Sequence, residues 1–498
     1  MLKRTLAMIL ALGMLLTATL SCGKAAEVSE TTTAAVTASE ATTEATGGGA
    51  GEETELTPKD LLDELGEKDF GGQSFTILDA NDYPTMHINV PGEELTGETI
   101  RDAIFERDIK IEERYGVAIE YVQSDNATKG MEMLKNDYFA GDKSFDMCIS
   151  TVNGGRLETL AVEGILANLC DMPALRLDAN WWSRLIYENC RIGDCMYFTS
   201  GDIAPATYDA PACVIMNRKL LNENKIETDF YQMVRDGKWT VDELLLLTKD
   251  TTVDVNNDGT LHADHDFFGV ICLNNAVTSS LMIAGCGVSL CTVEDDTLTV
   301  DLNTERTASV TEKLHELTVD IKYSLQQDVI DKAFKSDRGI ALIHCLETAK
   351  TALRDMESDY IILPMPKYDT EQDGYRSMMS GWVNCFVGFP NYVDTDFVGF
   401  VAEALARESY TSVRPQTYDL VFKLKGVREE GSSEMIDIIF NTLYIDFCSV
   451  YDFAEIIATM QGVIFKGQPF ASSVANRKKL LEKTVEKFIT NWNAAAEP

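Results

Sequence analysis

Residues 98–123, ETIRDAIFERDIKIEERYGVAIEYVQ, combine a helix pattern with a strand pattern. Ile100, Ile104, Ile111 and Tyr115 recur at intervals that place them on one face of a helix. Gly116 follows at once, and glycine commonly ends helices because it adopts the left-handed backbone conformation without a steric penalty. The next seven residues, VAIEYVQ, read as an alternating strand. The stretch therefore predicts a long helix that stops at Gly116 and a strand that begins directly after it.

The residues on either side repeat this succession of strand and helix. SFTILDA at 74–80 alternates as a strand does, and FDMCIS at 145–150 has the composition of a buried strand. Helical patterns lie near 129–138 and over 157–165, where apolar residues recur every three to four positions. Strands that alternate with helices predict an α/β sheet.

A second unit of the same kind begins near Ala212, where ACVIMNRKLLNEN predicts a strand that runs into a short helix. In KWTVDELLLLTKD, Thr240 and Glu243 have the spacing of a capping box, which predicts a helix start. RGIALIHC at 338–345 and YIILPMPKYD at 360–369 predict further strands, and roughly the last hundred residues are strongly helical. A folded part of this length exceeds what one hydrophobic core supports, so the sequence predicts two domains.

The start of the chain has the arrangement of an export signal. Lys3 and Arg4 precede an uncharged, mostly apolar run from Leu6 to Leu16, and small residues then lead to Cys22. This run is too short to span a bilayer core of about 30 Å. We therefore expect the segment to direct secretion and to be removed.

Residues 19–22, TLSC, resemble a lipobox, in which the cysteine after the cleavage site becomes acylated. Thr19 departs from that pattern, where Leu or Val is usual. The resemblance implies a signal peptide over 1–21 and a lipid on Cys22. The alternative is an ordinary signal peptide that is cut near Ala26.

Residues 22–60 have the composition of a tether. They contain no aromatic residue and few large apolar ones, so they cannot bury enough surface to offset the loss of chain entropy. We expect a disordered linker between a lipid and a folded domain. The predicted location is the extracellular face of the cell membrane, held there by the lipid anchor.

The charge of the chain is strongly acidic. Residues 1–21 hold two basic residues and no acidic one, so the exported chain carries 41 basic and 80 acidic residues. Nucleic-acid binding requires cations that face phosphates, so this balance argues against a nucleic-acid partner.

The cysteines do not have the arrangement of a disulfide framework. Eleven follow Cys22, an odd number, and none forms a Cys-x-x-Cys pair. Cys148 and Cys272 lie in apolar segments, where cysteine behaves as a small hydrophobe. Cys190 and Cys195 are candidates for one disulfide, but free thiols are the favoured interpretation.

The uncharged stretch from Gly269 to Cys291 has the length of a membrane span. It contains Asn, Thr, Ser and three glycines, which favours a strand, a loop and a core helix instead.

Residues 254–266, DVNNDGTLHADHD, resemble the start of an EF-hand calcium loop. Oxygen donors stand at alternate positions, and a glycine follows them for the tight turn. The closing glutamate of an EF-hand is replaced by His265, so Asp266 closes the site only if the loop holds one extra residue. The alternative is a solvated turn without metal. The predicted ligands of a structural Ca²⁺ are Asp254, Asn256, Asp258, the backbone carbonyl of Thr260, and Asp266.

Eight segments together resemble the extracellular solute-binding protein family 1 of bacterial ABC transporters, which includes many sugar and oligosaccharide binders. The resemblance covers nearly all of the chain from residue 70, through the order and spacing of the segments. It implies a type II periplasmic-binding-protein-like fold: two α/β lobes with a hinge and a ligand in the interlobe cleft. The segments are the lipobox, ETIRDAIFERDIKIEERYGV, LANLCDMPALRLDANWW, YFTSGDI, VIMNRKLLNEN, DGKWTVDELL, VDVNNDGTLHADHDFFG and ILPMPKYD.

The resemblance also implies where the chain divides. Lobe 1 is expected over 70–208 plus 341–388, and lobe 2 over 209–340 plus 389–498. The chain is expected to cross between lobes near Pro205–Pro211, near Arg338–His344, and again after Phe386.

Candidate ligand contacts follow from the position of loops after strands, because ligands of open α/β sheets bind at the carboxyl ends of the strands. Short amides and carboxylates can hydrogen-bond sugar hydroxyls, and an aromatic face packs on a sugar ring. Each candidate has a structural alternative, as a cap, a turn or a core residue. Of the pair Trp181–Trp182 we expect at least one in the core. The candidates are Asn81, Asp82, Thr151, Asn153, Asp202 and Trp382.

Signs of catalysis are few. The sequence has no His-Glu-x-x-His and no Gly-x-Ser-x-Gly motif. His344 and Cys345 are neighbours in a predicted strand and therefore point to opposite faces. A carboxylate pair for glycoside hydrolysis stays possible among so many acidic residues. We expect a non-enzymatic protein without a catalytic cofactor, and the alternatives are a secreted carbohydrate-active enzyme and a surface receptor without transport.

The expected function is capture of a solute for an ABC uptake transporter, with a sugar or oligosaccharide implied by the resemblance. The expected partners are this small molecule, the permease subunits in the membrane, and the membrane itself through the lipid anchor.

Overall fold

A computed structural model describes residues 58–82, 89–92, 94–152, 154, 156–294, 296–319, 332–422 and 431–495. The residues from Leu56 to Pro498 form one compact unit. The predicted signal peptide, Cys22 and nearly all of the predicted linker over 22–60 lie outside the described residues.

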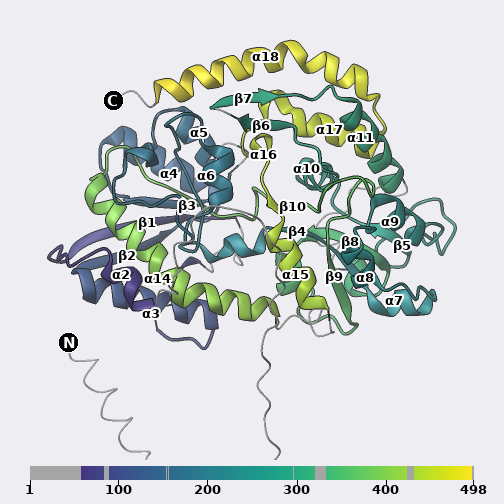
Figure 1. Ribbon diagram of the computed structural model, residues 1–498, viewed down its shortest axis with the longest axis horizontal. Coiled ribbons are helices and arrows are strands. Elements are labelled where there is room, and N and C mark those ends of the chain that lie inside the picture. Colours follow the sequence, from purple (N-terminus) through teal and green to yellow (C-terminus); the bar gives the residue numbers. More distant parts are fainter. Residues whose placement is uncertain are drawn as a thin grey trace, which may run out of the picture. The chain divides into compact units, whose positions relative to one another are not determined.

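The first sheet contains the strand that follows the helix ending at Gly116, together with three further strands (Figure 1). Strands β1 (Gln73–Ala80), β2 (Val117–Gln123) and β3 (Met147–Ser150) are parallel, and β11 (Phe386–Gly388) pairs antiparallel with β3. Helices α3 (Thr99–Tyr115) and α4 (Ala127–Ala140) connect the parallel strands. Gly116 ends α3 with a φ of 61° and donates its N–H to the carbonyl of Glu112, as the sequence predicts. We call the part built on this sheet lobe 1.

The second sheet has the strand order β5-β8-β4-β9. Strands β5 (Phe268–Ile271) and β8 (Gly339–Cys345) are parallel, whereas β4 (Ala212–Asn217) runs antiparallel to β8 and to β9 (Tyr360–Pro364). Every residue of β4 and β9 is buried, as expected for strands covered on both faces. We call the part built on this sheet lobe 2.

Local predictions in lobe 2 are confirmed. Helix α9 (Val241–Thr248) begins after Thr240, whose hydroxyl accepts the N–H of Glu243 at 3.3 Å. The uncharged stretch from Gly269 to Cys291 forms most of β5 and the buried helix α10 (Ala276–Gly285). Within the described residues, no helix combines the length and apolarity needed to cross a membrane.

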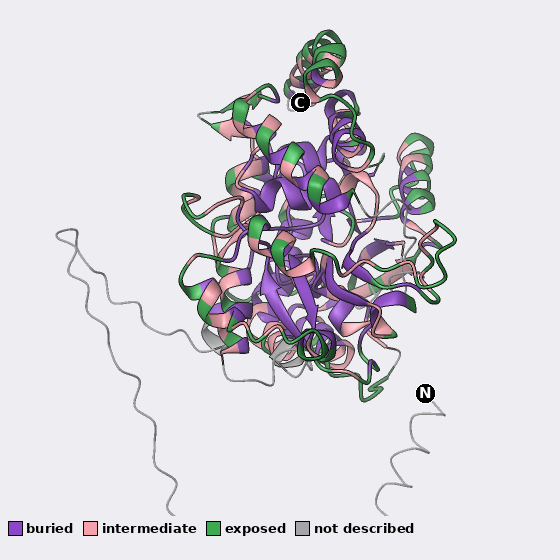
Figure 2. Cartoon of the chain, turned by 90° about the vertical axis from the view of Figure 1, so that its right-hand side faces the viewer, coloured by how far each residue is buried: buried purple, intermediate pink, exposed green. Residues whose placement is uncertain are grey.

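Figure 2 shows exposed residues gathered on the outer elements and buried residues gathered in the interior. The remaining elements are mostly helices. They are α2 (Pro58–Asp63), α5 (Leu157–Val162), α6 (Arg184–Cys190), α7 (Arg218–Glu223), α8 (Phe230–Arg235), α11 (Glu305–Thr318), α13 (Glu347–Lys350), α14 (Thr395–Phe422), α15 (Ser432–Asn441), α16 (Phe447–Val450), α17 (Ile456–Lys466), α18 (Phe470–Ala494), the 3₁₀ helices η2 (Leu169–Asp171), η3 (Pro205–Asp209) and η5 (Phe453–Glu455), and the short strands β6 (Cys291–Glu294), β7 (Thr297–Val300), β10 (Ser377–Met378) and β12 (Leu443–Tyr444).

Two segments that cross between the lobes run side by side. The first crossing segment, residues 201–211, carries η3 and leads into β4. The second, residues 379–385, leads from the lobe 2 side into β11. Pro211 bridges Met379, and the N–H of Ser380 donates to the carbonyl of Ala210 at 3.0 Å. The crossing predicted near Pro205–Pro211 falls on η3 and the residues that lead into β4.

The crossing predicted near Arg338–His344 is wrong. That segment forms β8, which pairs with β5 on one side and β4 on the other and lies inside the lobe 2 sheet. An apolar strand of this kind is stabilised by burial on both faces, so it stays within the core of its lobe. The chain enters the lobe 1 sheet instead through the second crossing segment, which leads into β11.

The helix packing and strand pairing also differ from the predicted lobe boundaries. Strands β8 and β9, which fall within the predicted lobe 1 segment 341–388, belong to the lobe 2 sheet. Helix α14, which falls within the predicted lobe 2 segment 389–498, packs against α2 and α3 of lobe 1. The long helix α18 contacts α5 of lobe 1 and both α11 and α17 of lobe 2. Each helix lies where its apolar face finds a complementary surface, which sequence order alone does not specify.

All eleven cysteines after Cys22 are free thiols, and all except Cys170 and Cys195 are buried. Burial raises the pKa of Cys272 and of Cys345 to about 12, so these thiols stay protonated and unreactive at neutral pH. They act as small core residues, as their apolar surroundings in the sequence suggest.

Candidate functional site

Three of the six predicted ligand contacts meet at the carboxyl ends of β1 and β3. The two strands are parallel and in register, with Ala80 opposite Ser150, so the residues that follow them lie on one edge of the sheet. Asp82 follows β1, and Thr151 follows β3. Trp382 reaches the same place from the second crossing segment. Asn153, the fourth residue predicted for this edge, lies outside the described residues.

Arg156 joins these three residues, although it was not among the predicted site residues. Its guanidinium donates to the Thr151 hydroxyl and to the Asp82 carboxylate, and it lies 4.7 Å from the centre of the Trp382 ring. Arg156 is 5% exposed, so its charge depends on Asp82 for compensation. A signal was present in the sequence, because an arginine directly before a helix is unfavourable for the helix dipole and suggests another role.

Trp382 differs from the four other tryptophans of the chain. The indole of Trp382 is 37% exposed, whereas Trp181, Trp182, Trp239 and Trp492 are all buried. One part of the ring packs on the Arg156 guanidinium, and the rest is available to solvent. The cluster of Asp82, Thr151, Arg156 and Trp382, which we call the Arg156 cluster, therefore sets two buried polar side chains and the partly exposed Asp82 beside an exposed aromatic ring.

Asn81 has a structural position. Its side chain is fully buried, and its amide donates to Asp79 of β1. The Sγ of Cys385, in the second crossing segment, lies 3.6 Å from the Asn81 Oδ1. Asn81 thus links β1 to the crossing segment, and direct contact with a solute stays a prediction for this residue.

Asp202 lies in the first crossing segment, beside Tyr208 and Arg414. The Tyr208 hydroxyl donates to its Oδ1, and the Arg414 Nη1 of α14 lies 3.7 Å from its Oδ2. The guanidinium of Arg414 also lies 4.9 Å from the Tyr410 ring centre and 5.4 Å from that of Tyr418. Asp202 is 2% exposed, and this burial raises its pKa to about 7 against the opposing effects of Arg414 and Tyr208.

The raised pKa of Asp202 predicts a pH-dependent stability. The folded state keeps the Asp202 proton between about pH 4 and pH 7, where the unfolded chain has lost it, so stability falls as the pH rises through this window. The slope is at most about 1.4 kcal/mol per pH unit. We expect Asp202→Asn to flatten this dependence in urea unfolding at pH 5 and pH 8. Asp178→Asn, at an exposed carboxylate, is the control, and equal slopes in both variants would contradict the assignment.

A second polar group lies after β8 in lobe 2. Lys350 of α13 donates to the Asp209 carboxylate of η3, and both side chains are 7% exposed. Burial raises the pKa of Glu347, with a further contribution from Asp209. Burial lowers the pKa of His344 to about 4, so its ring, which pairs with the Thr348 hydroxyl, is neutral at pH 7. No residue of this group was among the predicted ligand contacts, although it too follows a strand.

Asn384 in the second crossing segment is buried, and neither polar atom of its side chain has a hydrogen-bond partner among the described residues. An amide in this state costs about 1–3 kcal/mol unless water or a ligand satisfies it. It lies two positions from Trp382 in the same crossing segment.

The predicted calcium loop is ordered by its own side chains. Asp254 accepts the N–H of Gly259 at 2.8 Å, and Asp258 accepts the N–H of Thr260 at 2.8 Å. Asp266 is fully buried, and its two oxygens accept the N–H groups of Val255 and His262 at 2.9 and 2.6 Å. Asp266 therefore ties the two arms of the loop together, and the calcium ion stays a prediction.

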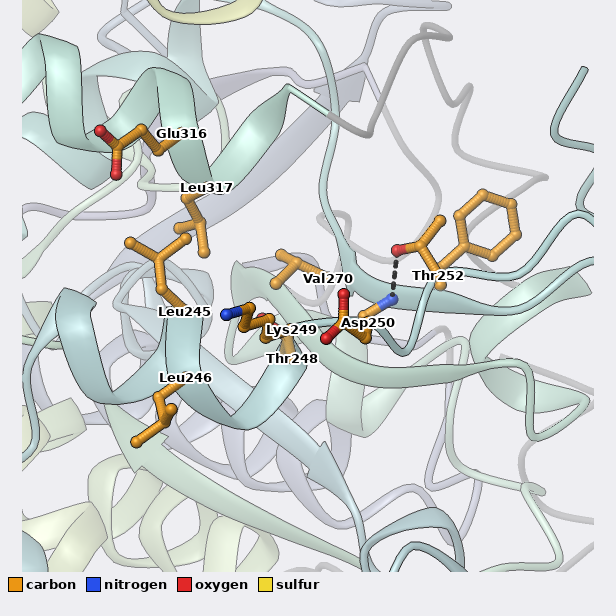
Figure 3. A pocket seen from close by; sticks show the side chains of 11 residues that line it. Leu245, Leu246, Thr248, Lys249, Asp250, Thr252, Val270, Glu316 and Leu317 are labelled. Carbon is orange, nitrogen blue, oxygen red and sulfur yellow. Dashed lines mark hydrogen bonds between the residues drawn. The ribbon is translucent and has the colours of Figure 1, made fainter. Parts of the chain in front are cut away.

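One described pocket has none of the predicted ligand contacts in its lining. It is lined by Leu245, Lys249 and Asp250 on the side of α9, by Val270 of β5, and by Glu316 of α11 among others (Figure 3). The hydrogen bond drawn there runs from the N–H of Gly269 to the hydroxyl of Thr252 at 3.1 Å. None of the predicted ligand contacts lines this pocket, so we do not assign the solute to it.

Many solved structures match the chain, whereas no protein-family model and no curated protein sequence matches it. The galacto-N-biose-/lacto-N-biose I-binding protein of the ABC transporter from Bifidobacterium longum matches with a TM-score of 0.55 and 13% identity, over 84% of this chain and 99% of that chain. The maltose/maltodextrin-binding domain MalE from Bdellovibrio bacteriovorus matches with a TM-score of 0.53 and 14% identity, over 83% and 100%. An ABC transporter solute-binding protein from Thermotoga lettingae matches with a TM-score of 0.52 and 15% identity, over 84% and 100%.

The chain has the two-lobed fold of the type II periplasmic binding proteins. This confirms the fold class expected from the sequence. In this fold, the Arg156 cluster stands at the carboxyl ends of the lobe 1 strands, and the Asp209–Lys350 pair joins the first crossing segment to the residues after β8. Both groups include a residue of a crossing segment, so a motion of one lobe against the other would change their geometry.

Proposed function

We propose that the protein captures a neutral sugar or oligosaccharide and delivers it to an ABC uptake transporter. The observation that carries this proposal is the Arg156 cluster, which combines hydrogen-bonding groups with the one exposed tryptophan at the carboxyl ends of β1 and β3. An aromatic face beside fixed polar groups suits a sugar ring, which has an apolar C–H surface and a rim of hydroxyl groups.

The charges of the site favour a neutral ligand. Arg156 is paired with Asp82, and Lys350 is paired with Asp209, so each buried cation already has a carboxylate partner. An anionic solute would have to displace one of these carboxylates, which leaves a buried charge uncompensated. A neutral polyhydroxyl compound requires no such exchange.

The solved structures with this fold support the same class of ligand. Those cited above are named for lacto-N-biose, maltotriose and α-D-tagatose as bound compounds. Each of these proteins shares less than one sixth of its residues with this chain, so the choice among sugars rests on this protein's own site. Delivery to a permease and the lipid anchor on Cys22 belong to the same proposal, supported by the segment from Lys3 to Cys22.

The first experiment is a thermal melt of the purified protein against a library of sugars, oligosaccharides and peptides. A compound present at 100 times its dissociation constant adds about 2.7 kcal/mol to the stability of the folded state, which raises the melting temperature visibly. We expect one class of neutral saccharide to raise it without formation of product. Turnover of an oligosaccharide would instead support the carbohydrate-active enzyme.

The same ligand tests the role of Trp382. We expect Trp382→Ala to weaken binding by about 30-fold or more, because a central tryptophan commonly contributes at least 2 kcal/mol. Tyr187→Ala is the matched control: the Tyr187 ring also packs on a guanidinium, that of Arg191 at 4.8 Å, but it lies outside the cluster. Calorimetric titration measures both affinities. Equal affinities in the two variants would remove the Arg156 cluster from the proposed site.

A further inference from the structure

The loop of residues 254–266 brings two histidines and a carboxylate together. The Nε2 of His262 lies 3.7 Å from the Oδ2 of Asp258, and the rings of His262 and His265 have their centres 5.1 Å apart. One ligand atom from each of these three residues lies within 4.8 Å of the others, and all three side chains are exposed. The solute-binding proposal uses none of them.

Two of these groups, Asp258 and His265, face the same hydrogen-bond donor. The amide Nδ2 of Asn256 donates to the Asp258 Oδ2 at 2.9 Å and lies 3.1 Å from the His265 Nε2. A single hydrogen-bond donor thus stands between a carboxylate oxygen and an imidazole nitrogen. A metal ion replaces such a donor when it binds, because it is attracted by the same electron pairs.

The loop holds these groups in place before any ion binds. Val253 and Phe267 pair across its base as antiparallel neighbours. The buried Asp266 accepts N–H groups from both arms, including that of His262. Preorganised ligands lose less conformational entropy on binding than ligands on a mobile chain.

We propose that Asp258, His262 and His265 form a site for a divalent transition metal, with zinc as the best-fitting ion. Zinc prefers imidazole and carboxylate ligands at about 2.0–2.2 Å in a tetrahedron, which places ligand atoms about 3.3–3.5 Å apart. The Asp258–His262 distance is already close to this value, and small rotations of exposed side chains bring in His265. Water completes the shell.

The ligand chemistry favours zinc over calcium. Calcium takes six to eight oxygen ligands, and the position that closes an EF-hand with glutamate holds His265 here. Imidazole nitrogen suits zinc and its neighbours in the transition series. The loop therefore keeps the turn of a calcium site but supplies the ligands of a transition-metal site.

Calorimetric titration of the purified, chelator-treated protein with ZnCl₂ tests the proposal. We expect one saturable site, weakened at least about tenfold in His262→Ala and in His265→Ala, because even supporting residues of metal sites contribute this much. Asp264→Asn, at an exposed carboxylate of the same loop, is the matched control and should keep the affinity of the unmodified protein. CoCl₂ should give a visible absorption band that requires both histidines.

Two results would overturn the proposal. One is zinc binding that is the same in the histidine variants and in Asp264→Asn, which would place the ion elsewhere. The other is stoichiometric displacement of zinc by CaCl₂ together with calcium binding that survives both histidine substitutions, which would assign the loop to calcium through its oxygen donors. Because the altered side chains are exposed, unchanged melting temperatures of the metal-free variants will show that they fold.

Discussion

Glu403→Gln should lower the free energy of unfolding by about 3–5 kcal/mol. Glu403 of α14 is fully buried and accepts the indole N–H groups of Trp181 and Trp182 at 2.9 and 2.8 Å. It also pairs with Arg407, whose Nε lies 2.8 Å away and whose side chain is 3% exposed. Glutamine keeps the volume of the side chain but has a single acceptor oxygen and no charge. The buried Arg407 guanidinium would then keep only the partly exposed Glu64, 3.1 Å from its Nη1, as a counter-charge.

Urea unfolding followed by tryptophan fluorescence measures this loss. Glu188→Gln is the matched control, because Glu188 forms an exposed ion pair with Arg184 at 2.7 Å, one helical turn away. Exposed pairs of this kind contribute about 0–1 kcal/mol. If the two variants unfold at the same urea concentration, Glu403 does not hold the Trp181–Trp182 segment to α14 in the way the structure indicates.

The local structure could be predicted from the sequence because local signals carry it. The helix that ends at Gly116, the cap at Thr240 and the strand patterns of 74–80 and 338–345 all depend on neighbours within a few residues. The assignment of α14 to a lobe could not be predicted in this way. Its place depends on Glu403 meeting two tryptophans more than two hundred residues earlier, and no pattern within α14 specifies that contact.

The candidate site was predictable in part for the same reason. Asp82, Thr151 and Trp382 follow strands or lie near a crossing segment, and these positions can be read from the order of elements. No role could be predicted for Arg156, because the contacts of its guanidinium with Asp82 and Trp382 form only in the folded chain. Asn81 shows the opposite case: its position after a strand is right, but its side chain turns into the core.

Lys350→Met should destabilise the protein by about 3–5 kcal/mol, because it leaves the Asp209 carboxylate buried without a cation. Glu347 adds to the loss. Its carboxylate repels that of Asp209, and Lys350 would no longer offset this repulsion. Part of the stability should return at low pH, where protonation removes the unpaired charge. Lys238→Met, at the exposed pair with Asp236, is the control and should change stability by less than about 1 kcal/mol.

The double variant Asp209→Leu with Lys350→Met separates the pair from its surroundings. Replacement of a buried ion pair by apolar residues of similar volume is often neutral or stabilising, so the double variant should recover most of the stability lost in Lys350→Met. Denaturant unfolding of the four proteins gives the coupling energy directly. A double variant as unstable as Lys350→Met would mean that Lys350 acts through other neighbours. Recovery would establish that Lys350 stabilises the protein through Asp209, and therefore that this pair links η3 of the first crossing segment to α13 of lobe 2.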